Sequence, residues 1–104
     1  MNTYLVGYDL NKPRGADDYE KLREALRQHS GYWWSYLDST FIIKSNYSAM
    51  QIAEALKSYL DSGDELLVVG LTGEWASLGF TDEANKWLRE NMSNAPSYVG
   101  YRYF

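Results

Sequence analysis

Asp9 is the residue of this chain whose position best suits chemistry. It ends the apolar run that begins at Thr3 and stands directly before a turn signal over 11–15. A carboxylate at a strand end can bind Mg²⁺ together with waters and phosphate oxygens. A metal held there can activate a water for attack on a phosphodiester. The alternative is local, because an Asp here can also accept hydrogen bonds from the backbone N–H groups of the Asn11-Lys12 turn.

Three basic side chains are candidates for binding phosphate. Lys12 and Arg14 follow Asp9 in the same predicted loop, and Lys44 lies near the end of a later predicted strand. The alternative for all three is ordinary solvated charge. Two cations in one loop do not by themselves indicate a phosphate site.

Composition limits the kinds of site that the chain can hold. The 104 residues include no cysteine and a single histidine, His29, which argues against a zinc ribbon, a disulfide framework and a multi-histidine metal cage. A net charge of −4 argues against sequence-independent coating of DNA, which needs a basic face. The motifs of P-loop nucleoside triphosphatases, dehydrogenases, zinc proteases and α/β-hydrolases are absent.

No apolar run approaches the roughly 20 residues of a membrane helix. The N-terminal residues also lack a basic leader and a cleavage site. We therefore expect a cytoplasmic protein with no membrane partner.

Hydrophobic periodicity and capping signals predict the elements that must position these residues. We expect strands at 3–10, 32–37, 40–45 and 65–71 and helices at about 17–29, 49–61 and 82–92. The second and third predicted strands read as a hairpin around Asp38-Ser39, although a single bent strand is an alternative. Ser48 and Gln51 form a capping box, and Thr81 caps the last helix. The tail 94–104 is either a fifth strand or a loose segment.

The order strand, helix, strand, strand, helix, strand is that of the split βαβ unit of ferredoxin-like folds. We therefore predict an α+β, ferredoxin-like βαββαβ sandwich with an extra C-terminal helix and a fifth strand as an option. Residues 1–104 would form one domain, with a core at about 3–71 and a C-terminal helix and tail at 81–104.

The first and fourth predicted strands are apolar on both faces. The first carries Leu5 opposite Tyr4 and Val6, and the fourth carries Leu67 and Val69 opposite Val68. A sheet with one face in water should alternate apolar and polar residues. The second face is therefore covered by a second protomer, most simply in a two-fold homodimer, or by the third helix and tail. A homodimer could also bring two copies of Asp9 to one metal.

These residues resemble a known family. The run from Leu5 to Leu10, an aromatic-rich second strand and Ser39-Thr40-Phe41 resemble the small CRISPR-associated Cas-two proteins. The chain is still more similar to the SinR-like relatives of that family. The segments that carry this likeness are Tyr4 to Pro13, Trp33-Trp34, Leu37 to Thr40 and Leu71 to Glu74. The chain departs from the Cas-two pattern at Ile42, where that family has glutamate or a similar residue.

The resemblance covers about residues 3–90 and implies a ferredoxin-like fold, a homodimer and nucleic-acid binding. Some Cas-two proteins are metal-dependent nucleases that use the Asp of the first strand, and others are non-catalytic scaffolds in spacer integration. The likeness thus implies Asp9 as catalytic and metal-binding residue, with Mg²⁺ or Mn²⁺. It also implies that Ser39 helps position a phosphate.

Two functions follow from the sequence. One is a homodimer that handles RNA or DNA, in which Asp9 serves a metal-dependent phosphodiesterase or nuclease. The other is a non-catalytic dimeric module, CRISPR- or defence-related, that binds a protein or a small nucleotide. The acidic charge, the 17 aromatic residues and the incomplete set of catalytic residues favour the second.

Overall fold

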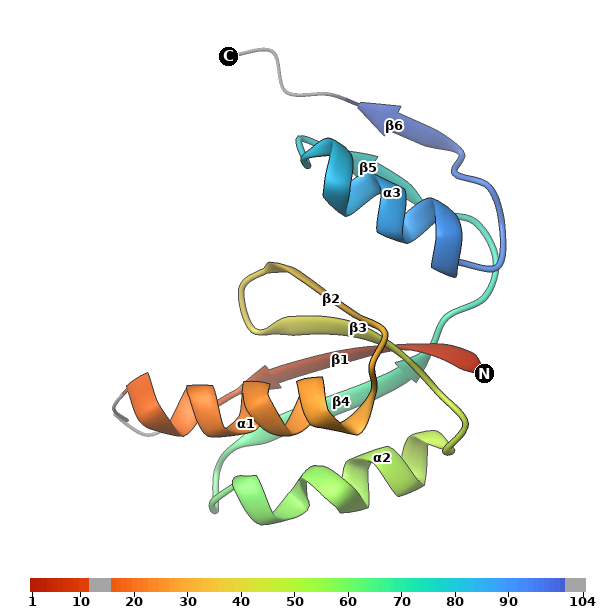
Figure 1. Cartoon of the computed structure of the whole chain (residues 1–104). Coiled ribbons are helices and arrows are strands. Elements are labelled where there is room, and N and C mark those ends of the chain that lie inside the picture. The colour runs from red at the N-terminus through yellow and green to blue at the C-terminus, as the bar shows by residue number, and fades with distance from the viewer. Residues whose placement is uncertain (12–15, 101–104) are drawn as a thin grey trace.

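A computed structural model describes residues 1–11 and 16–100 of the chain (Figure 1). The elements are β1 (Asn2–Asp9), α1 (Ala16–His29), β2 (Trp33–Leu37), β3 (Thr40–Ser45), α2 (Ala49–Leu56), the 3₁₀ turn η1 (Lys57–Tyr59), β4 (Glu65–Gly70), β5 (Ala76–Leu78), α3 (Asp82–Asn91) and β6 (Tyr98–Gly100). The chain is thus α+β, as predicted. No helix in the described residues is both long enough and apolar enough to span a membrane.

The main sheet has four antiparallel strands in the order β2-β3-β1-β4. β2 and β3 form the expected hairpin rather than one bent strand, and Ser39 adopts a left-handed φ of 50° in its turn. Helices α1 and α2 lie on one face (Figure 1). The core between sheet and helices contains Tyr4, Val6, Tyr8, Leu10, Leu22, Leu26, Phe41, Ile43, Ile52 and Leu56.

The capping box that the sequence predicts begins α2. The Ser48 hydroxyl accepts from the Gln51 backbone N–H at 3.1 Å, and the Gln51 side-chain oxygen Oε1 accepts from the Ser48 backbone N–H at 2.9 Å. The α-helix is shorter than predicted, because it ends at Leu56 and continues as η1. Gly63 then takes a left-handed φ of 91° in the turn before β4, a backbone region that glycine adopts without steric cost.

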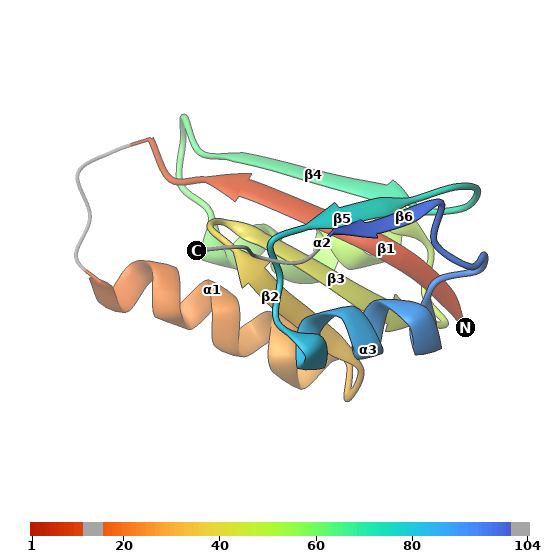
Figure 2. The same cartoon turned by 90° about the horizontal axis from the view of Figure 1, so that it is seen from above.

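A second layer covers part of the other sheet face. β5 and β6 pair in parallel, and α3 connects them. Figures 1 and 2 show this C-terminal unit on the side opposite α1 and α2. The tail thus supplies a strand at 98–100, and this strand pairs with 76–78, a segment between the fourth predicted strand and the last predicted helix. Residues 101–104 lie outside the described part of the chain.

Trp34 connects the two layers. It is 2% exposed, and its indole N–H donates to the Ala84 carbonyl of α3 at 3.2 Å. It packs with Ile42, Ala84 and Leu88 in a second apolar cluster. Its neighbour Trp33 is 40% exposed, which agrees with the alternation expected of a strand.

The second sheet face is therefore only half covered. α3 packs over the β2–β3 hairpin, whereas Leu67 of β4 is 61% exposed and Val69 is 39% exposed. We call Leu5, Leu67 and Val69, which share the face opposite α1 and α2, the open-face patch. We expected this face to be covered either by a second protomer or by the third helix and tail. The third helix and tail cover the part over the β2–β3 hairpin, and the part that carries the open-face patch is exposed in the single chain.

Ser77 and Asn85 form a buried polar pair within the C-terminal unit. The Ser77 hydroxyl donates to the Asn85 side-chain carbonyl at 2.7 Å, and the Asn85 amide nitrogen has no partner among the described residues. Ser77→Ala would leave the whole amide unpaired, which costs about 1–3 kcal/mol of unfolding free energy. Urea denaturation measures this, with Ser62→Ala at an exposed position as the control. Equal midpoints for both variants would contradict the prediction.

Candidate functional site

Asp9 lies beside a second carboxylate at one end of the sheet. Glu65 at the start of β4 stands directly opposite Asp9 in the antiparallel register. Both side chains therefore lie on one face, the one that carries the open-face patch, with Cβ atoms roughly 4.5–5.5 Å apart. Both residues are exposed. Two like charges facing each other across strands destabilise the pair, so this arrangement favours a bound cation.

A turn network holds Glu65 beside Asp9. The Asn11 side-chain amide donates to Glu65 Oε1 at 2.9 Å and to the Gly63 carbonyl. The Asn11 N–H donates to Asp64 Oδ1 at 3.1 Å. The alternative role of Asp9 was to accept hydrogen bonds from the backbone N–H groups of Asn11 and Lys12. The Asn11 N–H donates to Asp64 instead. Within the described residues, the Asp9 side chain has no hydrogen bond or ion pair.

The carboxylate pair borders a shallow hollow of about 410 Å³. Its lining residues are Gly7, Tyr8, Asp9, Glu65, Leu66 and Leu67. Burial raises the pKa of the Tyr8 phenol, and the Arg23 guanidinium beside it acts in the opposite direction. The Tyr8 ring itself lies on the α1 side of the sheet, in the core, so the open side of the hollow combines two carboxylates with the apolar side chain of Leu67.

Ser39 lies at the same end of the sheet as Asp9. Its backbone carbonyl accepts from the Tyr8 N–H at 3.1 Å, which places the hairpin turn next to the end of β1. Lys12 and Arg14 are outside the described residues. The structure therefore brings Asp9 and Ser39 to one end, and it says nothing of the two loop cations.

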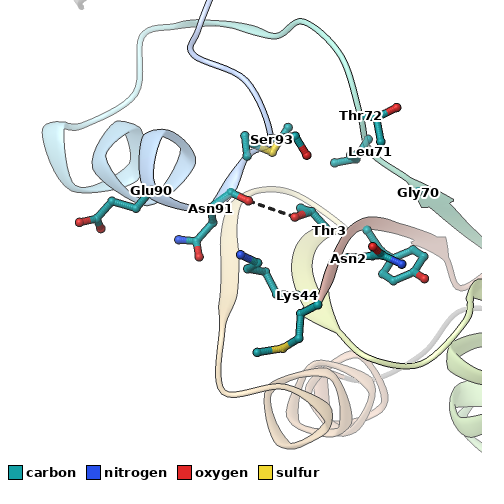
Figure 3. Close-up of a pocket in the computed structure, with 12 residues that line it drawn as sticks. Asn2, Thr3, Lys44, Gly70, Leu71, Thr72, Glu90, Asn91 and Ser93 are labelled. Atoms are coloured by element: carbon teal, nitrogen blue, oxygen red, sulfur yellow. Dashed lines mark hydrogen bonds between the residues drawn. The ribbon is translucent and has the colours of Figure 1, made fainter.

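Lys44 lies at the opposite end. It pairs with Thr3, six residues before Asp9, which is roughly 20 Å along the strand at about 3.3 Å per residue. Lys44 borders another hollow, of about 390 Å³, together with Glu90 and Thr72 (Figure 3). There the Thr3 hydroxyl donates to the Asn91 carbonyl at 3.0 Å. Lys44 is thus too far from Asp9 to hold the same phosphate.

Sequence reasoning missed Glu65, which is the first residue of β4 and precedes its apolar run. The signal for Glu65 was available, because antiparallel pairing of two strands puts the last residue of one beside the first of the other. Within the part of the chain that the structure describes, no group of three or more His, Cys, Asp or Glu side chains could hold a metal ion. One protomer therefore offers two carboxylates.

His29 ends α1 away from this pair. Its Nε2 lies 3.2 Å from the Ser45 hydroxyl, and its ring centroid is 5.3 Å from that of Tyr47. Burial lowers the pKa of the imidazole, although the end of a helix favours a cation. The desolvation effect is thus the larger of the two.

The lowered pKa of His29 predicts a pH dependence of stability. The unfolded imidazole titrates near pH 6.5, so below this pH the unfolded chain binds the proton more readily than the folded chain. The unfolding free energy should fall as the pH is lowered through about 6.5 toward the lower folded pKa. His29→Gln should flatten this slope in urea titrations between pH 5.5 and 7.5. An unchanged slope in the variant would assign the pH dependence to other groups.

No protein-family model matches the chain, and no curated protein matches it either.

Proposed function

We propose that this chain is a ferredoxin-like, Cas-two-like protein that forms a homodimer and handles nucleic acid with a divalent-metal site at Asp9 and Glu65. The observation that carries the proposal is the pairing of these two carboxylates beside the open-face patch. The element order and the strand order β2-β3-β1-β4, with α1 and α2 on one face, support the ferredoxin-like assignment.

The residues present fit a hard divalent cation. Mg²⁺ binds proteins through one or two carboxylates and keeps several waters. Asp9 and Glu65 supply that donor set, and Asn11 orients Glu65 by its hydrogen bond. Bound there, Mg²⁺ or Mn²⁺ would polarise a phosphoryl oxygen and lower the pKa of a bound water. The hairpin turn with Ser39 lies at the same end of the sheet as Asp9. The hollow beside Asp9 and Glu65 is shallow, so a phosphate chain can reach it.

The open-face patch supports the homodimer. Large apolar side chains each contribute about 1.5–3 kcal/mol when they are fully buried. A two-fold pairing of this face would bury Leu67 and Val69 of each protomer. The two Asp9–Glu65 pairs lie on that same face, so dimerisation would bring them closer to each other.

Leu67→Glu should prevent this association. A charged side chain at the centre of an apolar interface has to be desolvated without a partner. Sedimentation should give twice the 12.0 kDa chain mass for the parent protein and a single chain mass for the variant. Met50→Glu is the matched control, because Met50 is 70% exposed at the start of α2, on the helix layer. A parent protein that sediments as a monomer would refute the dimer.

The experiment that tests the function uses labelled single-stranded and duplex RNA and DNA, with Mg²⁺, with Mn²⁺ and with EDTA. We expect metal-dependent cleavage, or binding whose affinity falls as salt is raised. Absence of both, with a protein that is folded and dimeric, would refute nucleic-acid handling.

The second candidate function is a non-catalytic dimeric module that binds a protein or a small nucleotide. The favouring observation is that the described residues of one chain provide two acidic ligands and no third. Mass spectrometry of material released on denaturation would reveal a bound nucleotide. Cleavage activity with nothing co-purified would reject this alternative.

A further inference from the structure

A groove runs between the edge strand β2 and helix α3, far from the metal site proposed above. We call it the β2–α3 groove, and its volume is about 530 Å³. Figure 2 shows α3 alongside the β2–β3 hairpin. The lining residues are Trp33, Ser35 and Tyr36 of β2 and Glu83, Lys86, Trp87 and Glu90 of α3.

Aromatic rings form much of this surface. Trp33 is 40% exposed, Tyr36 is 42% exposed and Trp87 is half-buried. Ring faces of this kind attract guanidinium and ammonium groups when these lie within about 6 Å of the centroid. The Trp33 ring faces the α1 side of the sheet, where the Arg27 guanidinium carbon lies 5.7 Å from its centroid. Tyr36 and Trp87 thus make the groove chemically suited to cations as well as to flat rings.

The charges of α3 decide between these ligands. Glu83 and Glu90 both border the groove and are exposed, and Lys86 is the one cation among the lining residues. Within the described chain, neither glutamate forms an ion pair or a hydrogen bond with Lys86. Two carboxylates and one ammonium give a formal charge of −1, which repels a phosphate chain and attracts a cation.

The edge of β2 adds unpaired backbone groups. The Lys44 N–H donates to the Tyr32 carbonyl at 3.1 Å, so Tyr32 and Lys44 form a hydrogen-bonded pair. In an antiparallel ladder the next pair, Trp33 with Ile43, is non-hydrogen-bonded. The N–H and C=O of Trp33 therefore point away from β3, toward the open edge of the sheet. An extended peptide can add to such an edge through main-chain hydrogen bonds.

We infer that the β2–α3 groove binds an extended basic peptide segment. Its main chain pairs with the edge of β2 at Trp33, and its arginine or lysine side chain lies against Tyr36 and Trp87, between Glu83 and Glu90. The edge gives affinity without sequence selection, and the acidic aromatic groove selects the cation.

The test uses a capped peptide, acetyl-Thr-Val-Arg-Val-Thr-amide, and the same peptide with citrulline in place of arginine. Citrulline keeps the shape of the side chain and removes its charge. Tryptophan fluorescence and calorimetry should show the arginine peptide binding at least about 5-fold more tightly, with an affinity that falls as salt is raised. Hydrogen exchange at the Trp33 amide should slow on binding, as a paired edge requires.

Variants separate the groove from the rest of the surface. Tyr36→Ser, Glu83→Gln and Glu90→Gln should each weaken binding of the arginine peptide by about 2–5-fold. Tyr59→Ser and Glu54→Gln are the matched controls, since both are exposed and lie on η1 and α2. Equal affinity for the citrulline peptide, or no binding at millimolar peptide, overturns the inference. Binding of oligo-dT that Tyr36→Ser abolishes, with peptide binding unchanged, also overturns it and assigns the groove to nucleobases.

Discussion

Trp34→Ala should lower the unfolding free energy by about 3–5 kcal/mol, the largest effect that we expect from any single substitution in the second apolar cluster. Trp34 is 2% exposed and fills the space between the main sheet and the C-terminal unit. Its ring lies 5.2 Å from that of Phe80 and 5.3 Å from that of Tyr36. Truncation removes these contacts and leaves a cavity. It also leaves the Ala84 carbonyl without the indole donor.

The adjacent tryptophan is the natural control. Trp33→Ala removes a side chain of the same size that is 40% exposed, so it should cost much less, about 1 kcal/mol. Urea denaturation of both variants, followed by circular dichroism, measures the difference. In Trp34→Ala, hydrogen exchange should accelerate most in α3 and in β5 and β6, because these elements lose their attachment to the sheet. Similar costs for both variants would show that Trp34 does not hold the two layers together.

Asp9→Asn should reduce metal-dependent cleavage by at least about 100-fold, which corresponds to about 2.7 kcal/mol of transition-state stabilisation. The amide keeps the size of the side chain but lacks the charge that a divalent cation requires. Glu65→Gln should have a comparable effect, since both carboxylates belong to the same proposed site. Initial cleavage rates at saturating Mg²⁺ and Mn²⁺ measure both.

Stability measurements give a second readout that does not depend on activity. Without metal, Asp9→Asn should stabilise the fold by about 0.2–1 kcal/mol, because a facing pair of like charges is removed. With metal, the parent chain should gain stability by mass action and the variant should not. Asp38→Asn is the control, being an exposed carboxylate in the hairpin turn at the same end of the sheet. Full cleavage by Asp9→Asn would remove Asp9 from the catalytic role.

Local patterns in the sequence predicted most of the elements. The apolar runs in 3–10 and 40–45, the capping box at Ser48 and the cap at Thr81 each depend on residues within a few positions of one another. The backbone conformation that each of these patterns produces can therefore be predicted from a short stretch of sequence. The boundaries of β1, α1, β3 and α3 lie within one residue of those predicted. The 3₁₀ end of α2 and the short strand β5 have no such local signal.

The long-range features could not be predicted in this way. The parallel pairing of 76–78 with 98–100 joins segments 22 residues apart, and neither segment alone is long enough to show a strand pattern. The pairing of Asp9 with Glu65 likewise depends on the β1–β4 register, and the separation of Lys44 from Asp9 depends on strand direction.

By itself, the sequence determined an α+β chain whose helices cover one sheet face and whose sheet is apolar on both faces. Hydrophobic periodicity and helix caps depend only on residues within one helical turn or a few strand positions, so they can be recognised without knowing the fold. Only the tertiary structure decided how that second face is covered. α3 packs on the hairpin through Trp34, whereas Leu67 and Val69 stay exposed beside the carboxylate pair. The physical reason is that burial is set by packing between elements distant along the chain, and residue types within one element do not specify that partner.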